Sequence, residues 1–173
     1  KSGKNVLYLV PEIALSRQLE DRLTQHFGNR LLIYHSAETA SKRRNTGEII
    51  RNSDSYIILG TRSSLFLPHH DLGLIIVDEE HESSYVQDNN PKYDAKEIAS
   101  LRALKHNCPL ILGSATPSVV DYHKALTGEY ELITLNKRAN NKPLPKVEIV
   151  SLVDELKRGN TSVFSHKLRN EIL

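Results

Sequence analysis

The sequence contains little of what builds disulfide-rich, membrane-spanning or secreted proteins. A single cysteine, Cys108, excludes an internal disulfide and any cysteine-clustered zinc site within these 173 residues. No apolar run approaches the ~20 residues that a membrane span needs. The first residues, Lys1 to Lys4, lack the apolar core of a signal peptide. We therefore expect a cytoplasmic chain that does not contact membranes.

The composition is that of an ordinary globular domain without a dominant charge. Hydrophobic residues make up 39% of the chain, charged residues make up 25%, and the net charge is +2. A chain of this length buries roughly two-thirds of its unfolded surface, which is enough for a core. The charge is uneven, because residues 42–44 and 137–146 are basic and residues 78–82 are acidic. The net charge by itself neither requires nor excludes a nucleic-acid partner.

Apolar runs and helical patterns alternate along the chain. Strands are expected at residues 6–10, 31–34, 56–59, 74–77, 110–112 and 131–135. Helices are expected from Ile13 to Phe27, across 42–51 after a cap at Ser36, from Asp94 through Leu104, and from Pro117 to just before Gly128. This alternation predicts an α/β fold, a parallel sheet with helices on both faces. Beyond residue 137 we expect a polar linker, a short edge strand at 147–150 and a final helix at 165–173.

The run at residues 74–81 joins a buried strand to three acids and a histidine. Four aliphatic residues are typical of a central parallel strand that is covered on both faces. The three carboxylates of residues 78–80 repel one another, so this strand end needs a compensating positive charge. A magnesium ion that carries a nucleotide phosphate is one source of that charge. The alternative is a strand followed by a solvated acidic turn.

Polar motifs follow the expected strands at four places. They are Pro-Glu-Ile-Ala-Leu-Ser at 11–16, Gly-Thr-Arg-Ser at 60–63, Asp-Glu-Glu-His at 78–81 and Gly-Ser-Ala-Thr-Pro at 113–117. Carboxyl ends of parallel strands meet at one edge of a sheet, which is where ligands bind in such folds. The four motifs therefore predict one shared site.

The order and residues of these motifs resemble motifs Ia, Ib, II and III of superfamily 2 helicases with a DExH box. They are most similar to the PriA family, the primosomal replication-restart DNA helicases of bacteria. The resemblance runs from about Lys4 to the end of the chain. It implies a RecA-like motor that couples ATP hydrolysis to translocation and duplex unwinding at stalled forks. The implied partners are single-stranded and forked DNA, replication-restart proteins and single-strand-binding proteins. Two alternatives stay open: a non-catalytic DNA-binding or assembly module, and a DExH translocase of another family.

The resemblance assigns catalytic roles to motif II and coupling roles to motif III. Asp78 would hold magnesium through water, and Glu79 would orient or deprotonate the attacking water. His81 would hydrogen-bond to the hydroxyls of Ser114 and Thr116, linking the nucleotide state to the neighbouring strand end. Alternatively, Ser114 and Thr116 cap the helix at Pro117, and both roles are compatible.

The resemblance also implies a nucleic-acid surface. The residues expected to contact phosphates are Ser16, Arg17, Thr61, Arg62 and Ser63. Small hydroxyls, helix-start amides and a guanidinium suit a sequence-independent grip on the backbone. For Arg62 the alternative is a surface ion pair.

Aromatic residues after motif II are expected to stack on DNA bases. Loop 82–96 carries Tyr85 and Tyr93 for that role but has no tryptophan. Asp94 and Lys96 stand where the family has histidine and arginine, which puts DNA sensing by this loop in question.

The chain lacks a phosphate-binding loop of the expected form. Residues 1–5 do not have the upstream glycine, the hydroxyl residue after the lysine or the preceding strand that the motif requires. We therefore expect residues 1–137 to be a partial first RecA-like motor domain. Residues 138–173 would be an exit linker and the start of the connection to a second motor domain. ATP with Mg²⁺ would be the cofactor, and its P-loop and the family's zinc-binding cysteines would lie outside this chain.

A missing P-loop strand would also leave an apolar sheet edge. We expect the strand at 74–77 to be paired in one of three ways: with the strand at 110–112, with the C-terminal segment, or with a second molecule.

Overall fold

The computed structural model describes residues 3–36, 38–52, 55–136 and 145–172 of the chain. The chain forms two compact units, residues 1–132 and residues 133–173. Most of the expected linker, residues 138–144, lies outside the described residues.

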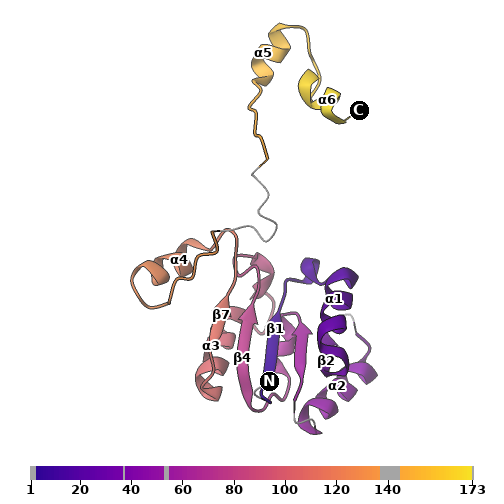
Figure 1. Ribbon diagram of the computed structural model, residues 1–173, viewed down its shortest axis with the longest axis vertical. Helices are drawn as coiled ribbons and strands as arrows, with labels where there is room; N and C mark the ends of the chain where they lie inside the picture. The colour runs from indigo at the N-terminus through magenta and orange to yellow at the C-terminus, as the bar shows by residue number, and fades with distance from the viewer. Residues whose placement is uncertain (1–2, 37, 53–54, 137–144, 173) are drawn as a thin grey trace. The chain divides into compact units, whose positions relative to one another are not determined.

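The first unit is built on one parallel sheet (Figure 1). Its five strands lie in the order β2 (Leu31–Tyr34), β3 (Ile57–Gly60), β1 (Asn5–Leu9), β4 (Leu72–Val77) and β7 (Leu110–Leu112). The helices of this unit are α1 (Arg17–Phe27), α2 (Ala40–Asn52), α3 (Ala95–His106) and α4 (Val119–Leu126). A two-stranded antiparallel ribbon, β5 (Val86–Gln87) and β6 (Tyr93–Asp94), lies between β4 and α3 in the sequence. The predicted α/β fold with a parallel sheet is confirmed.

Strand β4 lies inside the sheet. It pairs with β1 on one side and with β7 on the other, where Ile76 lies opposite Ile111. Of the three expected partners for this strand, the segment at 110–112 is the one present. Strands β2 and β7 form the edges of the described sheet, and Ile111 on β7 is 50% exposed.

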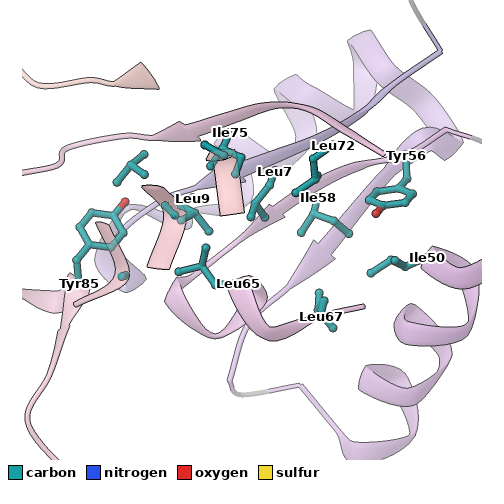
Figure 2. Packing of buried hydrophobic residues seen from close by; sticks show 14 residues of the cluster. Leu7, Leu9, Ile50, Tyr56, Ile58, Leu65, Leu67, Leu72, Ile75 and Tyr85 are labelled. Carbon is teal, nitrogen blue, oxygen red and sulfur yellow. The ribbon is translucent and has the colours of Figure 1, made fainter. Parts of the chain in front are cut away.

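One face of the sheet is buried in the core and the other is only partly covered. The core face carries Leu7, Leu9, Ile58 and Ile75, which cluster with Ile50 of α2 (Figure 2). Val77 of β4 and Ala95, Ala99 and Ala103 of α3 belong to the same cluster. Small alanine side chains on α3 allow this helix to approach the sheet closely. On the opposite face, Leu59 is fully buried, whereas Tyr8 and Ile76 are partly exposed. Since side chains alternate along a strand, Asp78 continues this second face, two residues beyond Ile76.

Capping residues fix the helix boundaries. Ser16 caps α1, which ends at Gly28 as predicted, with a positive φ of 56° that suits glycine. Helix α3 starts directly after Asp94, close to the predicted start, and the Asp94 carboxylate caps it by accepting from the Lys96 amide at 2.7 Å. The predicted cap at Ser36 is wrong, because α2 begins at Ala40 and the Thr39 hydroxyl accepts from the Lys42 amide.

Two strand predictions are wrong. Residues 131–136 and 145–150 form no regular structure, and Leu135 and Ile149 are 90% and 94% exposed. Short β-branched runs become strands only where a sheet edge is available to satisfy their backbone groups. Neither β2 nor β7 pairs with these segments in the described part of the chain.

The second unit contains two short helices. The helix expected at the C-terminus is present as α6 (His166–Ile172), and α5 (Leu152–Lys157) was not predicted. The Glu155 carboxylate joins the two helices, because it accepts from the His166 amide at 2.7 Å and from Asn160 Nδ2 at 2.7 Å. These contacts, first the His166 amide, lower the pKa of Glu155 to about 2. No helix among the described residues has the length and apolar character to cross a membrane.

Candidate functional site

The four predicted motifs meet at the carboxyl edge of the sheet. Pro11, Thr61, Asp78 and Ser114 follow β1, β3, β4 and β7, which all run in the same direction. Backbone hydrogen bonds join these strand ends: Asp78 N donates to Leu9 O at 2.9 Å, and Glu80 N donates to Gly113 O at 3.0 Å. The predicted shared position of the motifs is confirmed.

The carboxylate of Asp78 is held by two donors. Tyr8 on β1 donates its hydroxyl to Asp78 Oδ2 at 2.7 Å, and the Glu79 amide donates to Oδ1 at 3.0 Å. A Cβ placed on Gly113 would lie 3.5 Å from Oδ1, in ordinary van der Waals contact, so a side chain at this position would fill the space beside the carboxylate. Asp78 is therefore fixed in orientation and has space beside Oδ1.

Two tyrosine hydroxyls contact Asp78 at different atoms. Besides Tyr8 at the carboxylate, Tyr85 donates to the backbone carbonyl of Asp78 at 2.6 Å. Burial, followed by the hydrogen bond and charge of Asp78, raises the pKa of Tyr8 well above its ordinary value of 10.0. Burial likewise raises the pKa of Tyr85, with a smaller contribution from the charge of Asp78. Both hydroxyls therefore keep their protons, and act as donors, at neutral pH.

Glu79 has an unusual backbone conformation. Its φ is +48°, in the left-handed region that side chains other than glycine rarely adopt. Its side chain is 47% exposed, and its Oε2 lies 3.6 Å from Nδ1 of His81. Strained backbone of this kind concentrates at functional sites. Glu79 therefore combines a strained backbone with a half-exposed carboxylate.

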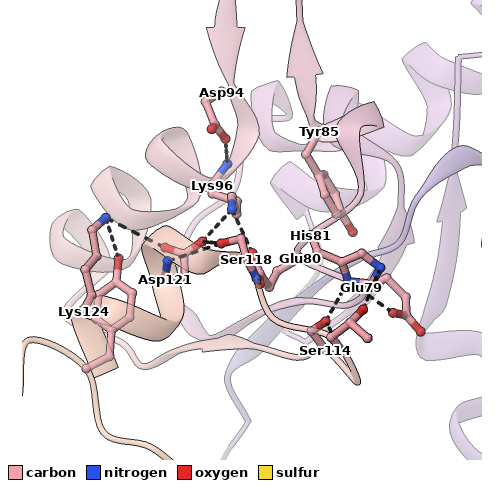
Figure 3. A network of polar contacts seen from close by, with 12 residues as sticks. Glu79, Glu80, His81, Tyr85, Asp94, Lys96, Ser114, Ser118, Asp121 and Lys124 are labelled. Carbon is pink, nitrogen blue, oxygen red and sulfur yellow. Dashed lines mark hydrogen bonds and ion pairs between the residues drawn. The ribbon is translucent and has the colours of Figure 1, made fainter. Parts of the chain in front are cut away.

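Glu80, by contrast, is buried in an ion-pair cluster (Figure 3). Its side chain is 2% exposed and accepts from Lys96 Nζ at 2.8 Å and from the Ser118 amide at 2.6 Å. Lys96 also contacts Asp121 of α4 at 2.6 Å. We name Glu80, Lys96 and Asp121 the carboxylate–lysine cluster.

The carboxylate–lysine cluster corrects part of the sequence interpretation. Magnesium was expected to compensate the acidic run, but Lys96 compensates Glu80 from within the protein. Burial lowers the pKa of Lys96, but the hydrogen bonds to Asp121 and Glu80 outweigh that effect and raise it overall. Burial raises the pKa of Asp121, and the contacts with Lys96 and Ser118 outweigh it and lower that pKa overall. Of the three carboxylates at residues 78–80, Asp78 and Glu79 lie outside this cluster.

His81 joins motif II to motif III. Its Nδ1 lies 2.6 Å from Ser114 Oγ, and its Nε2 lies 3.4 Å from Thr116 Oγ1 (Figure 3). The alternative role of Ser114 and Thr116 as helix caps is not what the structure shows. Helix α4 starts at Val119, and Ser118 caps it by accepting from the Asp121 amide at 3.2 Å. The contacts expected between His81 and these hydroxyls are present.

Arg62 contacts neighbouring backbone carbonyls. Its Nη1 donates to Ser84 O at 2.8 Å and to Val86 O at 2.7 Å. The guanidinium thus anchors the loop after motif II to the turn after β3, and the alternative of a surface ion pair is not observed among the described residues. Because Nη1 makes both of these contacts, a phosphate could bind only the other N–H groups of the guanidinium.

The other residues expected to contact phosphates differ in exposure. Ser16 and Arg17 lie exposed at the start of α1, where the Ser16 hydroxyl accepts from the Leu19 amide at 3.3 Å. Thr61 is 1% exposed, and its hydroxyl lies 3.3 Å from that of Ser63, which is half-buried. Thr61 therefore shapes the turn, while Ser16, Arg17 and Ser63 are accessible.

The two tyrosines of loop 82–96 have different surroundings. Tyr85 is 1% exposed and belongs to the core, so its ring is closed to bases and the stacking role expected for it is wrong in this conformation. Tyr93 is half-buried and packs edge-to-face on Phe66, with 5.0 Å between ring centroids. Phe66 is 56% exposed and is not among the residues predicted to contact DNA. The aromatic surface at this edge is therefore Phe66 with Tyr93.

The site fits a magnesium ion that keeps most of its own ligands. Among the described residues, no group of three or more His, Cys, Asp or Glu side chains is arranged to hold a metal. Mg²⁺ in nucleotide enzymes is commonly held by one or two carboxylates, waters and phosphates, so a single oriented aspartate suits it. Asp78, held by the Tyr8 hydroxyl and the Glu79 amide, is an oriented carboxylate of this kind.

The chain belongs to the DEAD/DEAH box helicase family, whose family model matches residues 1–124. It is similar to the Replication restart protein PriA of Bacillus subtilis, with 41% identity over 170 residues, 98% of this chain and 21% of that protein. The PriA of Synechocystis is 42% identical over 98% of this chain, and that of Haemophilus influenzae is 39% identical over 90%. The chain spans about a fifth of the length of these relatives.

These similarities confirm the resemblance predicted from the strand-end motifs, and the fold is a RecA-like parallel sheet. Among solved structures, the C-terminal part of the Fun30 ATPase domain matches with a TM-score of 0.42 and 12% identity over 77% of this chain and 41% of that chain.

Proposed function

We propose that this chain carries the catalytic acids of an ATP-dependent DNA helicase that acts in replication restart. Membership of the DEAD/DEAH box helicase family and similarity to PriA proteins support this proposal. The main structural support for this proposal is the arrangement of side chains at the end of β4. There, the oriented Asp78 and the exposed Glu79 lie beside a His81–Ser114 contact that reaches the next strand.

Each residue of this strand end has a distinct chemical task. Bound Mg²⁺–ATP supplies the phosphoryl group to be transferred and the charge that neutralises it. Asp78 offers an oriented carboxylate to the hydrated metal, and the Tyr8 and Glu79 donors keep it in place. Glu79 has an exposed carboxylate that accepts the proton of the attacking water.

The His81 contacts provide the link between nucleotide and nucleic acid. A shift of the turn at 78–81 moves Ser114 and Thr116 through these contacts, and with them the start of α4. DNA phosphates would meet Ser16, Arg17 and Ser63 at the same edge of the sheet. Forked DNA, replication-restart proteins and single-strand-binding proteins are the partners that this function implies. The cytoplasm is the corresponding compartment, and zinc belongs to another part of the full-length protein.

The domain assignment follows from the same proposal. Residues 1–137 would form the part of the first motor domain that carries motifs Ia to III, and residues 138–173 would lead toward the second motor domain. The ATP-binding loop would be supplied by another segment of the full-length protein.

The test is Glu79→Gln in the full-length protein. This change keeps the shape but removes the charge and the base, so hydrolysis should fall at least 100-fold while ATP affinity stays within about threefold. Glu97→Gln on the exposed surface of α3 is the matched control and should keep wild-type turnover. DNA-stimulated ATPase and strand-separation assays report the result. Near-normal hydrolysis by Glu79→Gln would place the catalytic carboxylate elsewhere.

The same assays distinguish the alternatives. A full-length wild-type protein that binds forked DNA but never hydrolyses ATP would be a DNA-binding or assembly module. ATP-driven movement along duplex DNA without strand separation would indicate a translocase.

A further inference from the structure

Tyr8 is the one side chain that donates to the Asp78 carboxylate among the described residues. Its hydroxyl lies 2.7 Å from Oδ2, whereas the only other donor to that carboxylate is the Glu79 amide, at Oδ1. A tyrosine in the middle of an apolar strand has to satisfy its hydroxyl when it is partly buried. Asp78 is the group that does so.

The sheet register explains why these two residues meet. Tyr8 of β1 lies opposite Ile76 of β4, and both side chains lie on the face opposite the core. Asp78 is two residues beyond Ile76 and so lies on the same face, at a diagonal position that the long side chain of tyrosine can reach. Strand β1 pairs without interruption with β3 and β4 around Tyr8, so the sheet fixes the position of the Tyr8 ring.

We propose that Tyr8 is a positioning residue that fixes the Asp78 carboxylate for the metal–nucleotide complex. The inference rests on the proposed function, because it assumes that Asp78 meets hydrated Mg²⁺. A neutral donor on Oδ2 restricts rotation of the carboxylate without cancelling its charge. Outer donors of this kind commonly change metal affinity when they are removed.

Tyr85 provides an internal comparison. It also donates to Asp78, at 2.6 Å, but to the backbone carbonyl rather than to the carboxylate. A tyrosine that only supports the fold should behave like Tyr85. A tyrosine that orients the metal-binding group should in addition change the contribution of magnesium.

The experiment measures ADP binding to the full-length protein by calorimetry, once with Mg²⁺ and once with EDTA. The ratio of the two affinities is the magnesium factor, and it needs no turnover. Tyr8→Phe should lower this factor about tenfold and leave the affinity in EDTA unchanged. Tyr85→Phe should leave the magnesium factor unchanged, although the variant protein loses a buried hydrogen bond and is less stable. Tyr34→Phe, on the edge strand β2, which β3 separates from β1, is the control for loss of a tyrosine hydroxyl from the sheet.

Each outcome decides the proposal. A magnesium factor within twofold of wild type in Tyr8→Phe overturns it, as does an equal fall in Tyr85→Phe. If Tyr8→Phe does not fold, Tyr8→Val replaces it, because valine is favoured in parallel strands, and the same tenfold fall is expected. A wild-type protein whose ADP affinity is independent of magnesium overturns the proposed function together with this inference. An unchanged Tyr8→Phe against a magnesium-dependent wild type overturns the inference alone.

Discussion

The carboxylate–lysine cluster makes Lys96 a decisive position for stability. Lys96→Met keeps most of the aliphatic stem but removes the charge that faces Glu80 and Asp121. These acids are 2% and 12% exposed, and the lysine itself is 20% exposed. Glu80 would keep its hydrogen bond from the Ser118 amide but would lose its counter-charge.

The magnitude follows from this burial. Breaking a buried ion pair by removing one partner costs about 3–5 kcal/mol. Because water can reach the lysine end of the cluster, we expect the lower end of that range, about 3 kcal/mol of unfolding free energy. For a chain of this size that corresponds to a fall in melting temperature of about 6–12 °C.

The assay is urea unfolding of the chain at pH 7, followed by far-ultraviolet circular dichroism because the sequence has no tryptophan. The raised pKa of Lys96 makes its contribution complete below 10.5 and lost as the pH rises through the folded value. The lowered pKa of Asp121 makes its contribution complete above 3.8 and lost as the pH falls through the folded value. Neutral pH lies inside both limits.

Lys124 provides a matched control, because it contacts the same acid, Asp121, as Lys96 does. Lys124 is 36% exposed and its Nζ lies 3.8 Å from Asp121, so Lys124→Met should cost less than about 1 kcal/mol. Glu80→Gln combined with Lys96→Met should cost less than the sum of the two single changes, because the buried charge is removed with its partner. A loss below about 1 kcal/mol in Lys96→Met would refute the reasoning and make the cluster an ordinary surface pair.

Three further predictions concern other parts of the chain. Glu79→Gly should change the unfolding free energy by less than about 0.5 kcal/mol, because relief of the positive φ offsets glycine's greater chain entropy, yet it should abolish ATPase in the full-length protein. Glu97→Gly in helix α3 should cost about 1 kcal/mol, and an equal loss at both positions would contradict the reasoning. His69 is buried, which lowers its pKa to about 4, so the folded state resists protonation and the unfolding free energy should fall as the pH drops from 6.5 toward 4. His69→Gln should reduce this pH dependence, whereas His123→Gln at an exposed position should not, as measured by urea unfolding across this pH range. The chain of residues 1–173 alone should bind Mg²⁺–ATP weakly and not hydrolyse it, since most phosphate contacts come from a P-loop, and micromolar affinity by calorimetry would contradict this.

The sequence alone determined several local features of this protein. The strand before Asp78, the helix start at Asp94 and the helix end at Gly28 each depend on neighbouring residues, and all are present. The order of the four motifs, with the rule that parallel strands share a carboxyl edge, predicted that the motifs lie at one edge of the sheet, as observed.

Tertiary structure decided which side chains meet. Lys96 lies 16 residues from Glu80, and Tyr8 lies 70 residues from Asp78, so neither pairing could be seen in a local pattern. For Tyr8, the order of strands in the sheet would have sufficed, because the register then places both residues on one face. Tyr85 resembles a loop aromatic in sequence but its ring packs in the hydrophobic core, where the Asp78 carbonyl accepts the hydrogen bond of its hydroxyl. The strand predicted at 131–135 is absent because a strand needs a neighbouring strand to pair with, and the local sequence does not show whether such a neighbour is available.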